Sequence, residues 1–260
     1  MSGHSHWATI KRKKGAGDAK RDQLFTKLAK EITLAAREGG GDANTNFKLR
    51  LSIDKARSNN MPKDSIDRAI KRGTGESKDG VEFTNTVYEG YGPKGSALII
   101  ECVTENKNRT VADVRHQLSR SGGSLGESES VAWQFTQRAF FLLTGDDLDF
   151  DRVFELALEN GGDDIEESDD GIEILAPVEN FKILSDALLK ANLHIEEAQL
   201  KMIPNTPVDL SLEDTLQVLR CVESLEDMDD VQTVYHNLNI SDEVYAALES
   251  DKLRDRKSVV

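Results

Sequence analysis

The first part of the chain carries apolar residues at helical spacing. They recur every three or four positions at Leu24, Leu28, Ile32 and Ala35. This spacing places them on one face of an α-helix and predicts a helix over residues 18–38. Shorter patterns of the same kind predict helices at 44–58 and 63–72. Turns rich in glycine, asparagine and proline separate the three segments, so we expect a small three-helix domain.

After residue 80 the apolar pattern changes to short runs typical of strands. Strands are predicted at 83–89 and 96–104, followed by a helix at 109–120. The glycine-rich segment 121–126 predicts a turn, because a phosphate-binding loop opens a helix and this segment follows one. Near the other end, a helix and a strand are predicted at 212–225 and 231–237. Neither group is a complete domain alone.

The segment between these groups has the order strand, helix, strand, strand, helix, strand. Its elements are predicted at 133–144, 149–160, 165–168, 172–175, 178–191 and 195–202. This order is the split β-α-β unit, a complete two-layer domain. We therefore expect an α+β multidomain fold, with an N-terminal three-helix domain and two ferredoxin-like α+β domains, one inserted in the other. The predicted parts are a basic helical domain at 1–80, a discontinuous α+β domain at 81–130 and 208–240, an inserted domain at 131–207 and a helical or mobile tail at 241–260.

Charge is distributed unevenly along the chain. The protein has 33 Lys and Arg against 47 Asp and Glu, a formal net charge of −14. Residues 1–80 nevertheless hold 18 of the cations and 10 of the anions, whereas residues 81–260 hold 15 and 37. Because a basic segment attracts polyanions, we expect nucleic acid to contact residues 1–80. The alternative is that the acidic part only keeps the protein in solution.

The strongest local feature is the basic stretch from Gly3 to Arg21. It contains a run of four cations: Lys11, Arg12, Lys13 and Lys14. Trp7 precedes this run. Lysine and arginine attract phosphates, and a tryptophan ring can stack on a base. The plainer alternatives are a solvated basic arm and a tryptophan that packs against the helices.

Motifs of common catalytic sites are absent from the sequence. It has no Gly-x-Ser-x-Gly motif, no Walker loop and no His-Glu-x-x-His zinc motif. Cys102 and Cys221 lie in apolar surroundings without metal-ligand spacing. We therefore expect a non-enzymatic protein without metal or cofactor. No apolar run reaches the ~18 residues that a membrane helix needs, so we expect a cytoplasmic protein without membrane contact.

Several segments together resemble the YebC/PmpR family, which includes the mitochondrial translational activator of cytochrome oxidase subunit I. The N-terminal matches are Gly3-His4-Ser5-His6-Trp7, Asp18-Ala19-Lys20-Arg21, Asn59-Asn60-Met61-Pro62 and Arg72-Gly73-Thr74-Gly75. The later matches are Tyr88-Glu89-Gly90-Tyr91-Gly92-Pro93, Asn108-Arg109-Thr110 and Ser130-Val131-Ala132-Trp133. The similarity extends to about residue 240. Two positions depart from the family pattern: Phe47 follows Asn46 where proline is common, and Ser124 stands where asparagine is common.

The resemblance implies a three-domain, non-enzymatic protein with one of two functions. Some members of the family are translation factors that bind the ribosome and relieve stalling at proline-rich stretches, and others are described as DNA-binding transcriptional regulators. The helix predicted at 63–72 offers no Asn or Gln that would recognise an adenine edge. Basic surfaces suit structured RNA, where phosphate and shape dominate recognition. We favour RNA, with DNA as the alternative. A scaffold whose acidic domains hold a protein partner is the third hypothesis.

We therefore expect the chain to bind ribosomal RNA on the ribosome, or DNA in the alternative. The expected contacts are the basic residues of the arm and the helix faces, together with two aromatic residues of the arm. They are His6, Trp7, Lys11, Arg12, Lys13, Lys14, Lys20, Arg21, Lys27, Lys48, Arg57, Lys71 and Arg72.

Overall fold

The computed structural model describes residues 18–76, 82–145, 148–168, 170–241 and 243–248, with side chains from Arg21 onward. These residues fall into two compact units. One consists of 32–76 and 136–203, and the other of 18–31, 82–135 and 204–248, apart from the gaps just given. The division passes through helix α2 (Asp18–Gly39), so each unit holds one half of it. The four domain ranges expected from the sequence remain predictions, because a division into two units does not test them.

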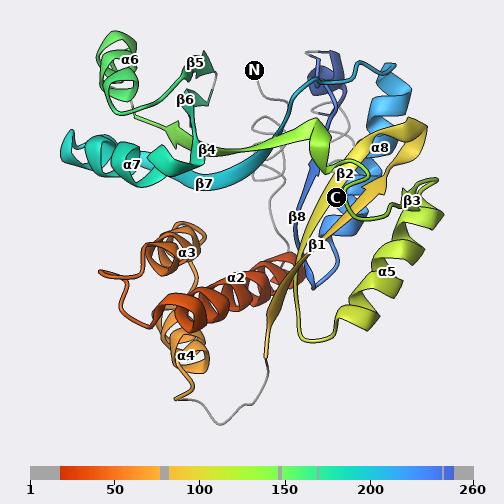
Figure 1. Ribbon diagram of the computed structural model, residues 1–260, viewed down its shortest axis with the longest axis horizontal. Coiled ribbons are helices and arrows are strands. Elements are labelled where there is room, and N and C mark those ends of the chain that lie inside the picture. The colour runs from red at the N-terminus through yellow and green to blue at the C-terminus, as the bar shows by residue number, and fades with distance from the viewer. Residues whose placement is uncertain (1–17, 77–81, 146–147, 169, 242, 249–260) are drawn as a thin grey trace, which may run out of the picture. The chain divides into compact units, whose positions relative to one another are not determined.

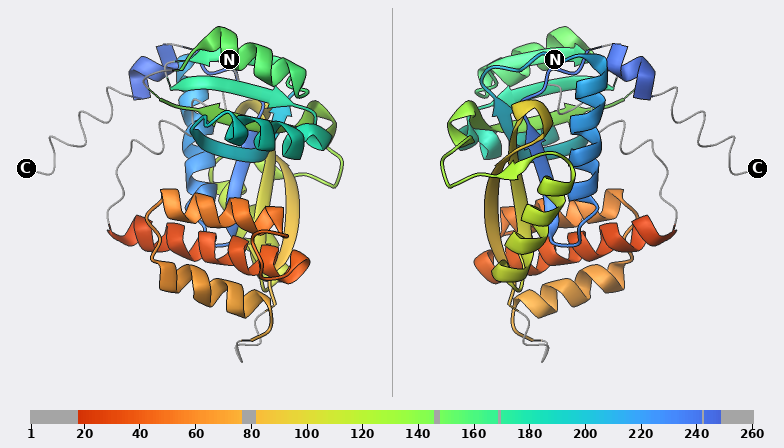
Figure 2. Two further views of the ribbon diagram at one scale, coloured as in Figure 1. Left: turned by 90° about the vertical axis from the view of Figure 1, so that its left-hand side faces the viewer. Right: turned by 90° about the vertical axis from the view of Figure 1, so that its right-hand side faces the viewer.

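The C-terminal half of α2, from residue 32, lies between α3 (Phe47–Ser58) and α4 (Lys63–Gly73) of the same unit (Figure 2). The facing sides of these helices bury apolar residues that recur at helical spacing, among them Ile32, Ala36, Leu49, Ile53, Ile66 and Ala69. The C-terminal end of α4 approaches α2 closely. A Cβ atom at Gly73 would lie 2.3 Å from the carbonyl oxygen of Thr33, so only glycine fits there.

The start of α3 depends on the buried residue Asn46. Its side chain accepts a hydrogen bond from the N–H of Leu49 at 3.1 Å, which caps the helix. The same side chain donates to the carbonyl oxygens of Ala35 at 2.7 Å and Gly40 at 2.8 Å. Asn46 therefore caps α3 while it binds the end of α2. The predicted start of this helix at residue 44 was wrong by three positions, because the turn before Asn46 is needed for this cap.

The second unit contains a four-stranded sheet with the order β3-β1-β2-β8. Its strands are β1 (Thr84–Tyr91), β2 (Ala97–Thr104), β3 (Ser124–Leu125) and β8 (Val231–His236). Strand β2 pairs antiparallel with β1 and with β8, which is distant in the sequence. The segment 121–126 was predicted as a turn only, but two of its residues pair with β1 as an edge strand.

Helices α5 (Lys107–Arg120) and α8 (Leu212–Glu226) form the core of this unit together with the sheet (Figure 1). The buried residues include Leu98, Ile100, Val114, Leu118, Val218, Val222 and Val234. Residues 243–248 are helical, and Val244 is buried in the same core.

The first unit contains a second four-stranded sheet, with the order β5-β6-β4-β7. In chain order its elements are β4 (Phe135–Leu143), α6 (Phe150–Glu159), β5 (Asp164–Ser168), β6 (Gly171–Ala176), α7 (Phe181–Lys190) and β7 (Ile195–Pro204). This is the strand order of the split β-α-β unit expected from the sequence. Three helices followed by two such sheets with helices confirm the predicted α+β class.

An aromatic cluster connects α3 to the core of this second sheet. The rings of Phe47 and Phe181 have centroids 5.3 Å apart in an edge-to-face arrangement, and Phe141 lies 4.8 Å from Phe181. Phe47 and Leu51 both pack against the buried residues of the sheet and its helices. The phenylalanine that departs from the family pattern is therefore a packing residue.

Candidate nucleic-acid interface

The structure describes only part of the predicted binding set. His6, Trp7 and the basic run 11–14 lie outside the described residues, as does the side chain of Lys20. Of the others, Arg21 is exposed on the N-terminal half of α2. The remaining predicted residues are Lys27, Lys48, Arg57, Lys71 and Arg72, and they divide into two groups with different surroundings.

Lys27 lies on a side of α2 that faces the turn between α8 and β8. Its amino group donates to the carbonyl oxygen of Glu226. One turn earlier, the amide of Gln23 donates to the carbonyl oxygen of Asp227 and, at 3.2 Å, to Oδ1 of Asp229. This side of α2 thus forms hydrogen bonds to acidic residues of the same chain. Lys27 therefore stabilises the fold.

The same side of α2 leads to a buried polar cluster around Asp230. Oδ1 of Asp230 lies 2.7 Å from the Lys30 amino group. Oδ2 accepts hydrogen bonds from Arg109 at 2.9 Å, from Thr110 at 2.8 Å and from Thr104 at 3.1 Å. Burial raises the pKa of Asp230, but the hydrogen bonds from Lys30, Arg109 and Thr110 outweigh it and lower that pKa from 3.8 to about 2. This cluster assigns a structural role to Arg109 and Thr110, two residues of the Asn-Arg-Thr segment of the family pattern.

The second group of predicted residues is displayed on the surface of α3 and α4. Lys48, Arg57 and Lys71 are exposed, and Arg72 is half-buried. Lys48 pairs with Glu38 at 2.7 Å and Arg57 with Asp54 at 3.5 Å. Exposed pairs of this kind contribute about 0–1 kcal/mol, so a phosphate can replace the carboxylate at little cost. Cations in the last turn of a helix also interact favourably with its dipole, which is their plainer role.

A shallow hollow of about 180 Å³ lies between α3 and α4. It is lined by Ile53, Arg57, Met61, Lys63, Ile66, Asp67 and Ile70. Two cations and one carboxylate, that of Asp67, border this largely apolar hollow, so its charged side chains carry a net charge of only +1. Lys63 was not among the predicted contacts, and its position beside Arg57 depends on the turn that joins the two helices.

The exposed face of α4 also carries negative charge. Asp64 and Asp67 are both exposed on it. Arg68 is held along the helix, because its guanidinium donates to the carbonyl oxygen of Asp64 at 3.2 Å and to the hydroxyl of Ser65 at 3.0 Å. Two carboxylates on this face would repel the phosphates that flank a DNA groove. The exposed cations of α3 and of the last turn of α4 are therefore better placed to contact nucleic acid than the middle of α4.

Trp133 is a strongly exposed aromatic residue that the sequence analysis did not include among the expected contacts. Trp133 was predicted to begin a strand but lies in the short helix η2 (Ala132–Gln134), and it is 71% exposed. The Glu89 carboxylate fixes this segment by accepting hydrogen bonds from the N–H groups of Glu129, Val131 and Ala132 at 2.7, 2.8 and 2.7 Å. Burial raises the pKa of Glu89, but these three bonds outweigh it and lower the pKa.

Within the described ranges, no group of three or more His, Cys, Asp or Glu side chains is arranged to hold a metal ion. No helix among the described residues combines the length and the apolar character that crossing a membrane requires.

Comparison with known proteins gives matches along nearly the whole chain. Residues 5–76 match the TACO1/YebC protein N-terminal domain, and residues 83–238 match the TACO1/YebC second and third domain. A "Probable transcriptional regulatory protein" of Tolumonas auensis is 51% identical over 250 residues, which cover 96% of this chain and 100% of that protein. A protein of the same name from Chlorobaculum parvum is 49% identical over 252 residues, again covering 96% and 100%.

A solved structure shares the fold. The crystal structure of a conserved hypothetical protein from Aquifex aeolicus superposes with a TM-score of 0.78 at 34% sequence identity, covering 85% of this chain and 91% of that one. The curated relatives are named as regulatory proteins and not as enzymes. The resemblance drawn from the sequence is confirmed: the chain belongs to the TACO1/YebC family.

Proposed function

We propose that this protein is a non-enzymatic regulator of gene expression that binds nucleic acid in the cytoplasm through the basic residues of its N-terminal part. One observation carries the proposal. Lys48, Arg57 and Lys71 are exposed on α3 and α4 in the segment with a cationic excess, whereas the rest of the chain is strongly acidic. Binding would be directed at phosphates, because lysine and arginine supply the sequence-independent part of nucleic-acid affinity.

The proposed contact set has two parts. The arm contributes His6, Trp7, Lys11, Arg12, Lys13 and Lys14, and the helices contribute Lys20, Arg21, Lys48, Arg57, Lys71 and Arg72. Lys27 is left out, since its amino group already binds the carbonyl oxygen of Glu226.

The name of the relatives supports transcription as the level of control, with DNA as the partner. This is the alternative raised by the sequence. In this alternative the basic residues of the contact set bind the phosphates of the DNA duplex. The regulated promoters would then be bound directly, and the transcript levels would respond first.

The surface of α4 supports a second candidate, a translation factor that binds ribosomal RNA and relieves stalling at proline-rich stretches. Asp64 and Asp67 lie on the exposed face of α4, where their carboxylates would repel the phosphates on either side of a DNA groove. Structured RNA is recognised largely through its phosphates and its shape, so α4 would not have to enter a groove and read base edges.

Crosslinking the full-length protein to nucleic acid in cells, followed by sequencing of the bound fragments, separates these candidates. Enrichment of defined duplex DNA sites, with transcript levels changing on deletion of the gene, supports transcriptional control. Enrichment of ribosomal RNA, with co-sedimentation on ribosomes and altered protein output at constant transcript levels, supports the translation factor. Recovery of neither class above a crosslinking control would overturn the proposal itself.

A further inference from the structure

One edge of strand β1 is paired over only part of its length. The opposite edge pairs with β2 from end to end. On the first edge, β3 pairs only with the last two residues of β1, Gly90 and Tyr91. The N–H of Gly126 then donates to the carbonyl oxygen of Glu89 at 2.8 Å, and the chain leaves the sheet. The stretch Thr84–Tyr88 is therefore an open strand edge.

The unpaired backbone groups on this edge belong to alternate residues. In an antiparallel ladder the N–H and C=O of one residue point to the same side, and those of the next residue point to the other side. Since the carbonyl oxygen of Glu89 faces β3, the backbone groups of Val87 and Asn85 face the same way. Neither residue has a backbone partner on that side within the described ranges. An extended polypeptide presents donors and acceptors at the spacing that these groups need.

Two other sheet edges carry protection that this one lacks. Charged side chains commonly guard an edge against pairing with another chain. At the edge of β8, the N–H of Val234 donates to the buried carboxylate of Glu226 at 3.2 Å. The edge strand β5 exposes the carboxylates of Asp164, Glu166 and Glu167. Residues 84–88 contain neither a charged side chain nor a proline, so nothing in the strand itself opposes a partner.

Two exposed apolar side chains lie on one face of β1 at this edge. Val87 is 56% exposed and Trp133 is 71% exposed. Because side chains alternate along a strand, Val87 lies on the same face as Glu89, whose carboxylate accepts a hydrogen bond from the N–H of Ala132. The indole N–H of Trp133 donates to the carbonyl oxygen of Ser130 at 3.1 Å, which holds the ring in place. A strand added at the edge would therefore meet apolar surface on this face.

The surroundings of the edge favour a single extended segment over a second copy of the chain. Helix α5 packs on β1 and β3 from the other face, where the Tyr88 hydroxyl donates to the carbonyl oxygen of Lys107 at 3.2 Å (Figure 1). If β1 paired with β1 of a second copy, both α5 helices would lie over the same two strands. Packed helices need about 8–10 Å between their axes, whereas paired strands are only about 4.8 Å apart, so the helices would collide. A segment without its own helix avoids this.

The side chains of the edge indicate those of the partner. Thr84 and Thr86 lie on the α5 side of the strand, and Asn85 and Val87 lie on the other. Threonine pairs well with threonine across strands, and valine pairs well with aromatic residues. In an antiparallel pair, the residues that bond Asn85 and Val87 have their side chains on the Val87 face. An uncharged segment that alternates aliphatic residues with threonine would fit both faces.

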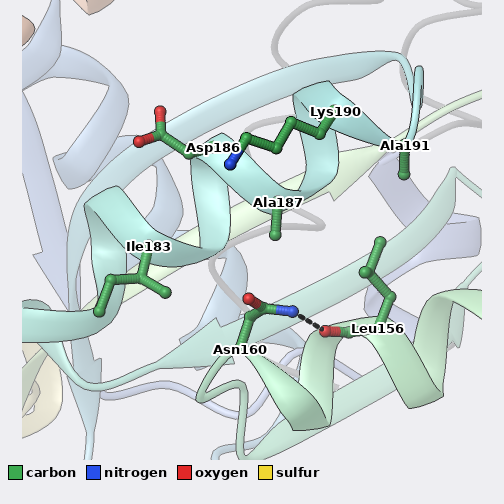
Figure 3. A pocket seen from close by; sticks show the side chains of 7 residues that line it. All are labelled: Leu156, Asn160, Ile183, Asp186, Ala187, Lys190 and Ala191. Carbon is green, nitrogen blue, oxygen red and sulfur yellow. Dashed lines mark hydrogen bonds between the residues drawn. The ribbon is translucent and has the colours of Figure 1, made fainter.

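A hollow of about 510 Å³ between α6 and α7, shown in Figure 3, offers no comparable selectivity. Asp186 and Lys190 both line it, so its charged side chains have opposite signs. The Asn160 amide in its lining already donates to the carbonyl oxygen of Leu156 at 2.8 Å. This lining does not specify one kind of partner, whereas the edge of β1 specifies an extended chain.

We propose that the open edge of β1 at Thr84–Tyr88 binds an extended, uncharged segment of a partner protein. The segment runs antiparallel to β1, as β3 does, and continues the sheet where β3 leaves it. Its aliphatic residues bond the backbone of Asn85 and Val87 and lie on the face of Val87 and Trp133. This is the strand-addition mode of recognition, in which backbone hydrogen bonds supply affinity and alternate side chains supply specificity.

The proposal is tested on the full-length protein with two synthetic peptides of about nine residues that alternate valine and threonine. One peptide is N-methylated at every threonine, and the other at every valine. N-methylation removes the N–H donor, so each peptide keeps only one edge that can donate hydrogen bonds. A valine on the Val87 face directs its N–H at β1. The threonine-methylated peptide should therefore bind, and the valine-methylated peptide should not.

Two variants test the edge itself. Val87→Lys places a charge on the apolar face, and Asn85→Pro removes an N–H that points away from β2, so that the ladder between β1 and β2 keeps its bonds. Leu158→Lys is the matched control, because Leu158 is also 56% exposed but lies on α6. Circular dichroism confirms that each variant is folded.

Fluorescence anisotropy should show that Val87→Lys and Asn85→Pro each weaken binding of the threonine-methylated peptide by about fivefold or more, and that Leu158→Lys leaves the affinity unchanged. Hydrogen exchange of the amides of Asn85 and Val87 should slow when this peptide is added. Equal binding of the two peptides, binding of neither, or binding of the valine-methylated peptide alone would overturn the proposal. Equal effects of the Val87 and Leu158 variants would overturn it as well.

Discussion

The amino group of Lys30 on α2 lies 2.7 Å from Oδ1 of Asp230, the residue just before β8. Both side chains are largely buried, at 11% and 10% exposure. Because Arg109 and Thr110 bond the other carboxylate oxygen, one aspartate joins α2 and α5 to the start of β8. The N-terminal half of α2 is thus part of the second unit.

Replacing Asp230 by alanine should destabilise the second unit strongly. The change leaves the Lys30 ammonium buried without its partner, and breaking a buried pair in this way costs about 3–5 kcal/mol. Urea unfolding at neutral pH measures the loss, and hydrogen exchange of β2 and β8 locates it. Asp113→Ala, at an exposed position of α5, is the control and should change the stability by less than about 0.5 kcal/mol. Equal stability of the two variants would contradict the assigned role.

Stability should also depend on pH through His236 on β8. This side chain is 1% exposed, and burial lowers its pKa from 6.5 to about 4. The unfolded chain therefore binds a proton more readily than the folded one below about pH 6.5. The stability from the neutral imidazole is complete above that pH and is lost as the pH falls to about 4, a change of about 3 kcal/mol.

Urea midpoints between neutral pH and about pH 4.5 measure this change in the His236→Gln variant and the wild type. The variant should be less stable at neutral pH but should lose less stability on acidification. His194→Gln is the control, because the side chain of His194 is 70% exposed. If the His236 variant and the wild type lose stability in parallel, the buried imidazole does not control the stability of the protein in this pH range.

Glu89→Gln should loosen the segment that displays Trp133. The glutamine amide retains one acceptor oxygen, so at least one of the three N–H groups at residues 129, 131 and 132 loses its acceptor. An unsatisfied buried donor costs about 1–3 kcal/mol. Faster hydrogen exchange of these amides, with a change in tryptophan fluorescence, is the expected result. Glu127→Gln, at an exposed position in the same loop, should leave both unchanged.

Local signals in the sequence predicted most of the fold. Apolar periodicity placed α2, α4 and α8 within a few residues of their observed limits, because each helix buries one face. The edge strand β3 was missed, since two residues are too few to show a period and their pairing depends on β1. The start of α3 was missed because it depends on bonds from Asn46 to the end of α2.

The candidate site was harder to predict, because the sequence shows charge but not the direction of a side chain. Lys27 and Lys48 look alike in the sequence, yet one binds a carbonyl of its own chain and the other is exposed. Asp230 lies far along the chain from Lys30 and Arg109, so no local pattern could connect them. A signal for the cluster did exist, since Asn-Arg-Thr recurs in the family pattern without an obvious surface role.

Phe47 and Phe181 should be energetically coupled. Their rings meet edge to face at 5.3 Å, and such pairs contribute about 0.5–1.5 kcal/mol beyond the area that they bury. A double-mutant cycle with Phe47→Leu and Phe181→Leu measures this coupling through urea unfolding. Phe150 and Phe154, whose rings are 5.9 Å apart on α6, give a comparison pair within one helix. Additive effects of the two substitutions at 47 and 181 would show that α3 does not depend on this pair of rings.

The central claim is that exposed cations before residue 80 bind nucleic-acid phosphates. If six to ten cations engage duplex DNA, affinity should fall by about 10³–10⁵ between about 50 and 200 mM salt, with a shallower fall on single strands. Changing Lys11, Arg12, Lys13 and Lys14 together to alanine should flatten the salt slope by about one unit for each phosphate that these side chains neutralise. Trp7→Ala should weaken binding by about 1–3 kcal/mol if the ring stacks on a base.

The most direct measurement is a salt titration of nucleic-acid binding by two triple-alanine variants of equal net charge. One variant replaces Lys48, Arg57 and Lys71, and the other replaces the exposed α5 residues Lys107, Arg115 and Arg120. The first should bind more weakly with a flatter salt slope, and the second should bind like the wild type. Equal behaviour of the two variants, or loss of binding only in the α5 variant, would contradict the claim.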